Sequence, residues 1–411
     1  MRPSSSSEGS SESQSRDLPP GAAPHAAPGA AQATDPATAR SAERGFTRCV
    51  PATLTARKIS TYTALGFAGY VIASLVGAVL SVAWGLTLAE RLIGLLVPPI
   101  AFLIAVTVAS AIVRRERIVF YEAAITGVVA IAVISVVAGV RVARLVDLAT
   151  LGIGTFLVFG RIGCFTVACC HGTLGRGVTY GPSHVRAGFW RRWEGRALWP
   201  VQLFESAASA ILVVAGVRAD ARPGTAAIVY IVGYGAARFC LELVRGDAYR
   251  PYLRGISEAQ WLALASVVAC AIWRPQPVTI GIAMALAAAT ALLARRAERR
   301  ELFLPPHLRE LDDVCNRVLA DPVHARRETS RGVALSCYAM PDGRLDWVMS
   351  SGHPAWSVTA ARRLAIALWS EHEVVEGRAR SVIHVIVPPA GSVVAASGSA
   401  ARTLEDDPQL N

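Results

Sequence analysis

The chain has 411 residues, of which 53% are hydrophobic and 17% are charged. Because soluble domains carry about 25% charged residues, this composition excludes folding around one soluble core. The net charge is +11, and all basic residues except Lys58, the single lysine, are arginines. No nucleic-acid module accompanies that charge, so we expect no nucleic-acid partner. The eight cysteines are scattered along the chain without regular spacing, so they imply no disulfide scaffold.

Composition divides the chain into four parts. Residues 1–55 are rich in Ser, Pro and Ala without apolar periodicity, which predicts a disordered tail. Residues 59–297 carry the long apolar blocks and form the predicted transmembrane domain. Residues 300–390 return to a soluble composition, and residues 391–411 are predicted to be a second disordered tail.

The apolar blocks have the length of helices that cross a hydrocarbon core of about 30 Å. The predicted spans are 61–85, 92–112, 118–139, 148–168, 199–217, 226–243, 258–273 and 277–294. The seventh is short, so two topologies stay open: eight crossings, or seven crossings and a re-entrant segment. The predicted fold is an all-α polytopic integral membrane protein with seven to eight transmembrane helices.

The soluble part reads as a small folded domain. An amphipathic stretch at 308–321 is followed by two strand-like runs around the turn at 341–343, a helix-like stretch at 359–369 and a strand-like run at 381–387. Helix, hairpin, helix and strand predict a small C-terminal α+β soluble domain.

The sixth predicted span contains a polar stripe of Tyr234, Arg238, Glu242 and Arg245. Their spacing places them on one face of a helix. A charged side chain inside a span costs about 2.5–3.5 kcal/mol, so a general bias toward arginine does not explain them. Two interpretations stay open: an internal ion pair that holds helices together, or a cationic site for an anionic substrate.

The fourth predicted span has Asp147 at one end and Arg161 near the other. Gly160 and Gly163 flank this arginine, and Gly172 follows the span. Glycines in a membrane helix permit close packing or a break that exposes backbone N–H groups. The planar fork of an arginine at such a break suits a phosphate group.

Four motifs occur in order along this part of the chain. They are GRIGCF around Arg161, WPVQLFE at 199–205, YGAARFCLELVRGD at 234–247 and GISEAQW at 255–261. In sequence and separation they resemble the motifs of the prolipoprotein diacylglyceryl transferase family. The resemblance covers about residues 59–275, and Asp147 and Tyr62 also match family positions.

Members of this family move a diacylglyceryl group from phosphatidylglycerol to the lipobox cysteine of prolipoproteins in the bacterial plasma membrane. The resemblance implies that Arg161 and Arg238 hold the phosphate and stabilise the charge that develops on it. It implies phosphatidylglycerol, prolipoprotein signal sequences and the lipid bilayer as partners, and no cofactor. The residues expected to orient the arginines or to line the site are Tyr62, Asp147, Gly160, Gly163, Gly172, Gln202, Glu205, Tyr234, Glu242 and Arg245.

The chain also departs from the family pattern. Tyr121 stands where the family has the histidine of a His-Gly-Gly-Leu motif, Cys164 replaces an asparagine, Cys169 an acidic residue and Trp199 a histidine. A proposed general base is therefore missing. One interpretation is a catalytically lapsed homologue that still binds anionic phospholipid.

His171 is the candidate to replace the missing base, since imidazole titrates near neutral pH. A solvated loop histidine is the alternative. Cys164, Cys169 and Cys170 precede it, and on a helix the two adjacent thiols would point about 100° apart. We therefore expect the thiols to pack as apolar side chains and to bind no metal. Metal ligation, thiol redox chemistry and substrate handling stay open as alternatives.

The orientation in the membrane has two conflicting indications. Counting of basic residues in loops places the loop 169–198 and the C-terminal domain in the cytoplasm, whereas the resemblance places the site on the outer face. Seven crossings would put the C-terminal domain on the opposite side from the site. Trp190, Arg191, Arg192 and Trp193 in this loop are predicted to form an interfacial belt that meets lipid headgroups.

Overall fold

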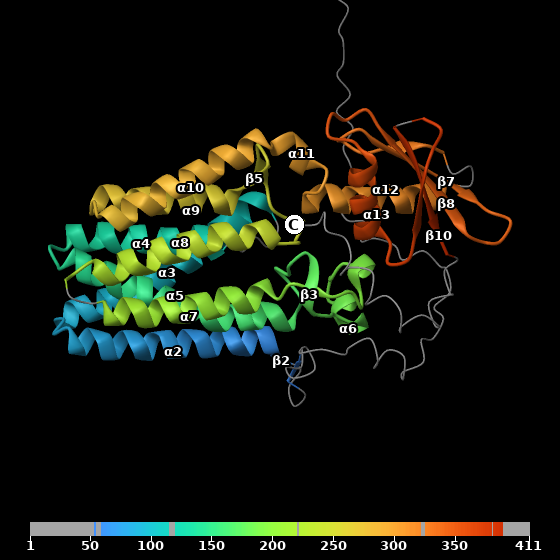
Figure 1. Cartoon of the computed structure of the whole chain (residues 1–411). Coiled ribbons are helices and arrows are strands. Elements are labelled where there is room, and N and C mark those ends of the chain that lie inside the picture. The colour runs from blue at the N-terminus through green and yellow to red at the C-terminus, as the bar shows by residue number, and fades with distance from the viewer. Residues whose placement is uncertain are drawn as a thin grey trace, which may run out of the picture.

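The computed structural model describes residues 53–54, 59–114, 120–219, 222–321, 325–379 and 381–388. Apart from residues 53–54, the predicted tails 1–55 and 391–411 lie outside this range. A short antiparallel pair, β1 (Thr53–Leu54) and β2 (Ile59–Ser60), precedes the first long helix. Figure 1 shows a bundle of long helices with a smaller domain at one end.

Eight apolar helices make up the bundle (Figure 1). They are α2 (Thr61–Ala83), α3 (Leu88–Val113), α4 (Phe120–Val137), α5 (Val142–Thr166), α7 (Val201–Arg218), α8 (Thr225–Leu241), α9 (Glu258–Trp273) and α10 (Pro277–Arg295). Six of them are long and apolar enough to cross a membrane, and α4 and α9 are shorter apolar helices. The predicted fold class, a polytopic helical membrane protein with a small soluble domain, is confirmed.

Local sequence explains where several helices begin. Thr87 and Glu90 form a capping box at the start of α3, and Ser257 and Gln260 do the same for α9. The helix α5 begins six residues before the predicted 148–168 span, because polar residues in its first turns lower the local hydropathy without interrupting the helix. Asp147 therefore lies inside the helix and is completely buried.

Asp147 holds the start of α8. Its carboxylate accepts hydrogen bonds from the backbone N–H groups of Gly224 at 2.6 Å and Ala227 at 2.8 Å. These are groups that the helix itself leaves without acceptors. The contact fixes α8 against α5 at one end of the bundle. Arg161 lies fourteen residues further along α5, about 21 Å away.

The segments that connect the helices at the opposite end contain several short elements and are bonded to one another. Between α5 and α7 the chain forms β3 (Leu174–Val178), α6 (Pro182–Arg186) and η2 (Arg191–Trp193). Between α8 and α9 it forms η3 (Glu242–Val244), β4 (Tyr252–Leu253) and β5 (Ile256–Ser257).

Two backbone hydrogen bonds join these connecting segments. Thr173 donates to the carbonyl oxygen of Val244 at 2.8 Å, and Gly246 donates to that of His171 at 2.9 Å. The two segments thus form one layer over the ends of the helices.

The C-terminal domain follows a short helix, α11 (Ala297–Glu301). It contains α12 (Pro305–Ala320), α13 (Val358–Leu368) and a five-stranded antiparallel sheet. The strands lie in the order β6 (Arg327–Glu328), β7 (Val333–Ala339), β8 (Leu345–Ser351), β10 (Val382–Val387) and β9 (Glu373–Glu376). The hairpin, both helices and the last strand match the predicted elements, whereas the two short edge strands were not predicted.

This domain packs on the loop between α5 and α7. Trp190 Nε1 donates to Asp312 Oδ2 at 2.5 Å, and Arg192 forms an ion pair with the same carboxylate. Trp193 Nε1 donates to the carbonyl oxygen of Ala367 at 3.1 Å. Because Trp190 and Trp193 are buried in this contact, the predicted headgroup belt is wrong for these residues and for Arg192.

The loop also caps the end of α13. Arg192 and Arg196 donate to the carbonyl oxygens of residues 366 to 368, the last acceptors of that helix. Cations at a helix C-terminus interact favourably with its dipole. The C-terminal domain therefore lies on the same side of the bundle as this loop. The alternative with seven crossings would separate them across the membrane, so these contacts favour eight crossings.

We predict that Asp312→Ala loosens this interface. The change leaves the indole N–H of Trp190 and the guanidinium of Arg192 without their acceptor, at a cost of about 1–3 kcal/mol. Hydrogen–deuterium exchange of the loop 189–198 should become faster. Asp313→Ala is the matched control, since that neighbouring side chain is exposed. Equal exchange in both variants would contradict the interface.

Candidate active site

A buried cluster of charges has Glu205 of α7 at its centre. Tyr234 OH donates to Glu205 Oε1 at 2.6 Å, and Arg238 Nη1 donates to Oε2 at 3.1 Å. Arg161 Nε lies 2.9 Å from the same oxygen. Arg238 also pairs with Glu242, which begins η3 directly after the end of α8. One carboxylate thus joins side chains from α5, α7 and α8.

Arg245 extends the cluster beyond the end of α8. Its Nη1 lies 3.5 Å from Glu205 Oε2, and its Nε donates to Asp247 Oδ1 at 2.6 Å. Arg250 Nη1 lies 3.1 Å from Glu242 Oε1, and Arg250 Nε donates to Asp247 Oδ2 at 3.1 Å. Although burial raises it, the pKa of Asp247 lies below its usual value because Arg245 and Arg250 favour the carboxylate.

The cluster has an excess of positive charge. Its four arginines face three carboxylates, which leaves one net positive charge. Among the described residues, Arg238 Nε and both terminal nitrogens of Arg245 are buried without a hydrogen-bond acceptor. Buried cationic donors are costly unless an acceptor reaches them. The cluster is therefore suited to one anionic group with several oxygens.

Arg161, Arg238 and Arg250 border a cavity of about 1000 Å³ at the end of the bundle where the C-terminal domain sits, whereas Arg245 does not line it. Arg161 and Arg238 line it together with Tyr62 of α2 and Tyr121 of α4. Arg309 of α12 also lines the cavity and lies over the Trp190 ring, 5.0 Å from its centroid. The C-terminal domain thus contributes a cation to the wall.

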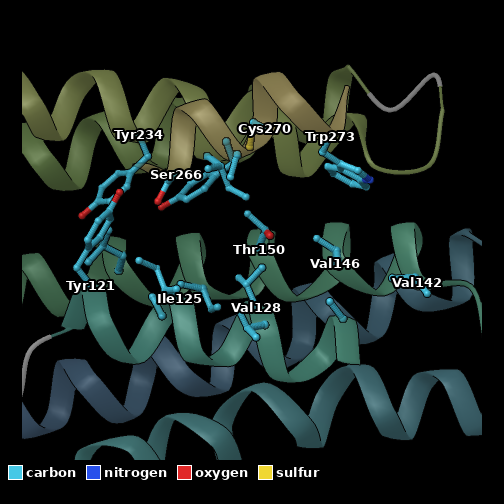
Figure 2. Close-up of a pocket in the computed structure, with 18 residues that line it drawn as sticks. Tyr121, Ile125, Val128, Val142, Val146, Thr150, Tyr234, Ser266, Cys270 and Trp273 are labelled. Carbon is cyan, nitrogen blue, oxygen red and sulfur yellow. The ribbon is translucent and has the colours of Figure 1, made fainter. Parts of the chain in front are cut away.

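A second, apolar cavity of about 370 Å³ lies between α4, α5, α8 and α9. Tyr121 lines both cavities. Figure 2 shows Tyr121 and Tyr234 at one end of the apolar cavity and Trp273 toward the other. An apolar channel inside the bundle therefore begins beside the charged cluster.

His171 is buried and lines the larger cavity, so it is not the solvated loop residue of the alternative interpretation. Its Nδ1 lies 2.9 Å from the carbonyl oxygen of Gly172, and the rings of Phe189 and Trp193 pack against it. Because a carbonyl only accepts, Nδ1 carries the proton and Nε2 is the basic nitrogen of the neutral ring. Burial lowers the pKa of His171, which favours that neutral form.

The predicted glycines have different environments. A Cβ on Gly172 would lie 2.4 Å from the carbonyl oxygen of Trp199, and one on Gly163 would lie 3.2 Å from the Tyr62 ring. At both positions another segment approaches the backbone so closely that only glycine fits without a shift of its neighbours. Gly160 has only a side chain of its own helix within 4 Å of such an atom, so packing does not require glycine there.

Two predicted site residues are not brought to the charged cluster. Gln202 Nε2 donates to the carbonyl oxygen of Cys169 at 2.8 Å and to Tyr180 OH at 3.3 Å, so it fixes the turn that follows α5. Asp147 lies at the opposite end of the bundle, where it caps α8.

The three thiols near Arg161 do not lie on one helix. Since α5 ends at Thr166, Cys169 and Cys170 belong to the turn beyond it, and the sequence argument from helical directions is wrong. The pKa of the Cys170 thiol lies well below its usual value, because Cys164 and Cys169 hydrogen-bond to it and Arg245 and Arg161 favour its thiolate.

Sequence reasoning missed four charged residues that line the cavity, namely Asp247, Arg250, Glu258 and Arg309. Asp247 and Arg250 stand at or just beyond the end of the motif at 234–247, where their spacing from Arg245 could have indicated them. Arg309 belongs to an amphipathic surface helix, and nothing in its sequence context indicates a place in the cavity.

The fold and site define a multi-pass membrane protein with a buried, arginine-rich anion cavity and an adjoining apolar cavity. The family model of prolipoprotein diacylglyceryl transferases matches residues 56–274. The chain belongs to this family of transferases, and the match covers the helices that carry the charged cluster. No curated protein matches the chain.

We predict that Glu205→Gln strongly destabilises the membrane domain. The amide has nearly the shape of the carboxylate but leaves three buried guanidinium groups without their shared anion. Breaking a buried ion pair in this way costs about 3–5 kcal/mol. Thermal unfolding in detergent should show the loss, with Glu298→Gln on the exposed face of α11 as the control. An unchanged midpoint would show that Glu205 does not hold the arginines.

For Asp147→Ala we expect lower stability with unchanged ligand affinity. The variant removes the two acceptors at the start of α8 and should cost about 1–3 kcal/mol. Thermal unfolding measures the first effect, and binding of an anionic phospholipid measures the second. Weaker lipid binding in a variant of normal stability would place Asp147 in the binding site after all.

Proposed function

We propose that this protein transfers the diacylglyceryl group of phosphatidylglycerol to the thiol of a lipobox cysteine in prolipoproteins. The thiol sulfur attacks the glycerol carbon that carries the phosphate ester, the carbon–oxygen bond breaks, and a thioether forms. The bonding electrons leave on the phosphate oxygen, so glycerol phosphate is released. Lipoprotein biosynthesis is the process that such a reaction serves.

The observation that carries this proposal is the excess positive charge beside the large cavity. One phosphodiester anion would compensate the net charge of the cluster, and Arg238, whose buried Nε has no acceptor among the described residues, lines the cavity that would hold it. As the ester bond breaks, negative charge grows on the leaving phosphate. Arginines fixed in advance by Glu205 and Glu242 stabilise that charge without rearrangement.

The adjoining cavities agree with a substrate that has a charged head and apolar chains. With the phosphate near Arg161 and Arg238, an acyl chain would pass Tyr121 into the apolar cavity. Its lining is almost wholly aliphatic and aromatic, with a wall from α4 and α9. This arrangement leaves the carbon under attack between the two cavities.

The basic nitrogen of His171 is our candidate acceptor for the thiol proton. The ring is neutral and lines the same cavity as Arg161, and its orientation is set by Gly172 and two aromatic rings. A general base of this kind contributes about 10²–10⁴-fold. In this role His171 compensates for Tyr121 at the position of the family histidine.

We further propose that the site faces the outside of a bacterial plasma membrane, where translocated precursors present their cysteine. The C-terminal domain lies on the same side as the site, because Asp312 and α13 bind the loop 190–196. An impermeant thiol reagent should therefore label single cysteines introduced at positions 186 and 342 alike on intact cells. Protection of both would place the site in the cytoplasm.

We predict that Arg161→Ala and Arg238→Ala each lower transfer at least about 100-fold, the usual loss for one donor to developing negative charge. Lysine at either position should recover little activity because it lacks the planar fork. The assay follows the mass gain of a lipobox peptide in micelles that contain phosphatidylglycerol. Arg218→Ala, at the exposed far end of α7, is the control.

Two outcomes would overturn this assignment. Near-normal transfer in both alanine variants would remove the arginines from the reaction. Lipid binding by the native protein without peptide modification, and failure to restore lipoprotein modification in cells depleted of their own transferase, would instead indicate a lapsed homologue that binds phospholipid.

A further inference from the structure

Three thiols converge on the wall of the large cavity. Cys164 lies in the last turn of α5, and Cys169 and Cys170 lie in the turn that follows it. Their sulfur atoms all lie within 4.8 Å of one another. All three residues line the cavity beside Arg161, so an ion of small size can reach them from it.

The backbone of this turn is bent in an unusual way to bring the sulfurs together. Ala168 and Cys170 have φ values of 58° and 57°, two of only four positive values among the non-glycine residues that the structure describes. A left-handed residue with a side chain costs about 1–2 kcal/mol. Gln202 stabilises the bend by donating to the carbonyl oxygen of Cys169. Backbone strain that a folded protein keeps in one segment is common at functional sites.

The chemistry of the three ligands indicates the kind of ion. Thiolates are soft donors that select Cu(I), zinc and iron–sulfur clusters. Structural zinc sites have four protein ligands, whereas this group contains three thiols. Three sulfurs at about 2.3 Å from a metal lie about 4 Å apart, so small side-chain rotations are sufficient to close the site.

The surroundings offset one of the two negative charges of such a complex, with the same excess positive charge that an anionic ligand of the cavity would use. Three thiolates around one monovalent cation carry two negative charges. Arg161 lies one turn before Cys164 on α5, and it belongs to the cluster that has one positive charge in excess. The ligand group is therefore placed where the protein compensates negative charge.

We propose that Cys164, Cys169 and Cys170 form a three-coordinate site for a soft monovalent cation, Cu(I). Binding exchanges the thiol protons for the metal ion, and no change of oxidation state takes place. This site does not depend on the transfer reaction proposed above.

The test uses the full chain in detergent micelles, reduced with a phosphine and titrated with Cu(I) from a coloured chelator. We expect one Cu(I) per chain to leave the chelator. Cys169→Ser and Cys170→Ser should each weaken this binding at least about 10-fold, since each loses one of three ligands. Cys240→Ser, which removes an exposed thiol of α8, and Cys315→Ser, which removes a buried thiol of the C-terminal domain, should bind as the native chain does.

Thermal unfolding distinguishes loss of the ligand from loss of the fold. With the native midpoint retained in the absence of metal, weaker binding in the Cys169 and Cys170 variants supports the site. Equal Cu(I) affinity in the native chain and in both of these variants would overturn the proposal. So would native protein that takes no Cu(I) from the chelator after full reduction.

Discussion

The candidate site depends on one buried carboxylate. Arg161, Arg238 and Arg245 come from α5, from α8 and from the segment after α8, and all three approach Glu205 of α7. Three cations would repel one another in the interior of the bundle, so without this anion they could not share one place. Among the described residues, Arg238 Nε and the terminal nitrogens of Arg245 keep no hydrogen-bond acceptor, which is what an anionic ligand requires.

The soluble domain also helps to form the candidate site. Two tryptophan indoles and two arginines of the loop 190–196 bind Asp312 and the end of α13, while His171 at the start of the loop faces the cavity. The loop is thus fixed from both sides, by the helices below it and by the domain above it. Because Arg309 comes from that domain, the cavity is complete only in the full chain.

Much of this could be predicted from sequence because it has a local or periodic signal. Hydropathy places the helices within a few residues, and Tyr234 and Arg238 mark the site face of α8. The prediction of one helix face for the whole stripe is wrong, because α8 ends at Leu241 and Glu242 and Arg245 lie beyond it. Contacts between distant segments leave no such signal. Asp147 was expected in the site but caps α8, since a carboxylate in a helix does not indicate which backbone groups it will meet. The thiol cluster likewise depends on left-handed residues that are not glycine.

The fixed position of the domain also changes the argument about membrane orientation. Arg192 and Arg196 cap α13, and the arginines of the motifs are buried beside carboxylates. The positive-inside rule concerns charge in short loops that resists translocation, whereas these side chains have structural partners in the folded protein. Counting them as orientation signals therefore overstates the case for a cytoplasmic site. The outward orientation still conflicts with the basic run at 295–300, where Arg300 donates to the carbonyl oxygen of Gly255, and with the basic residues at 57–58 and 114–117.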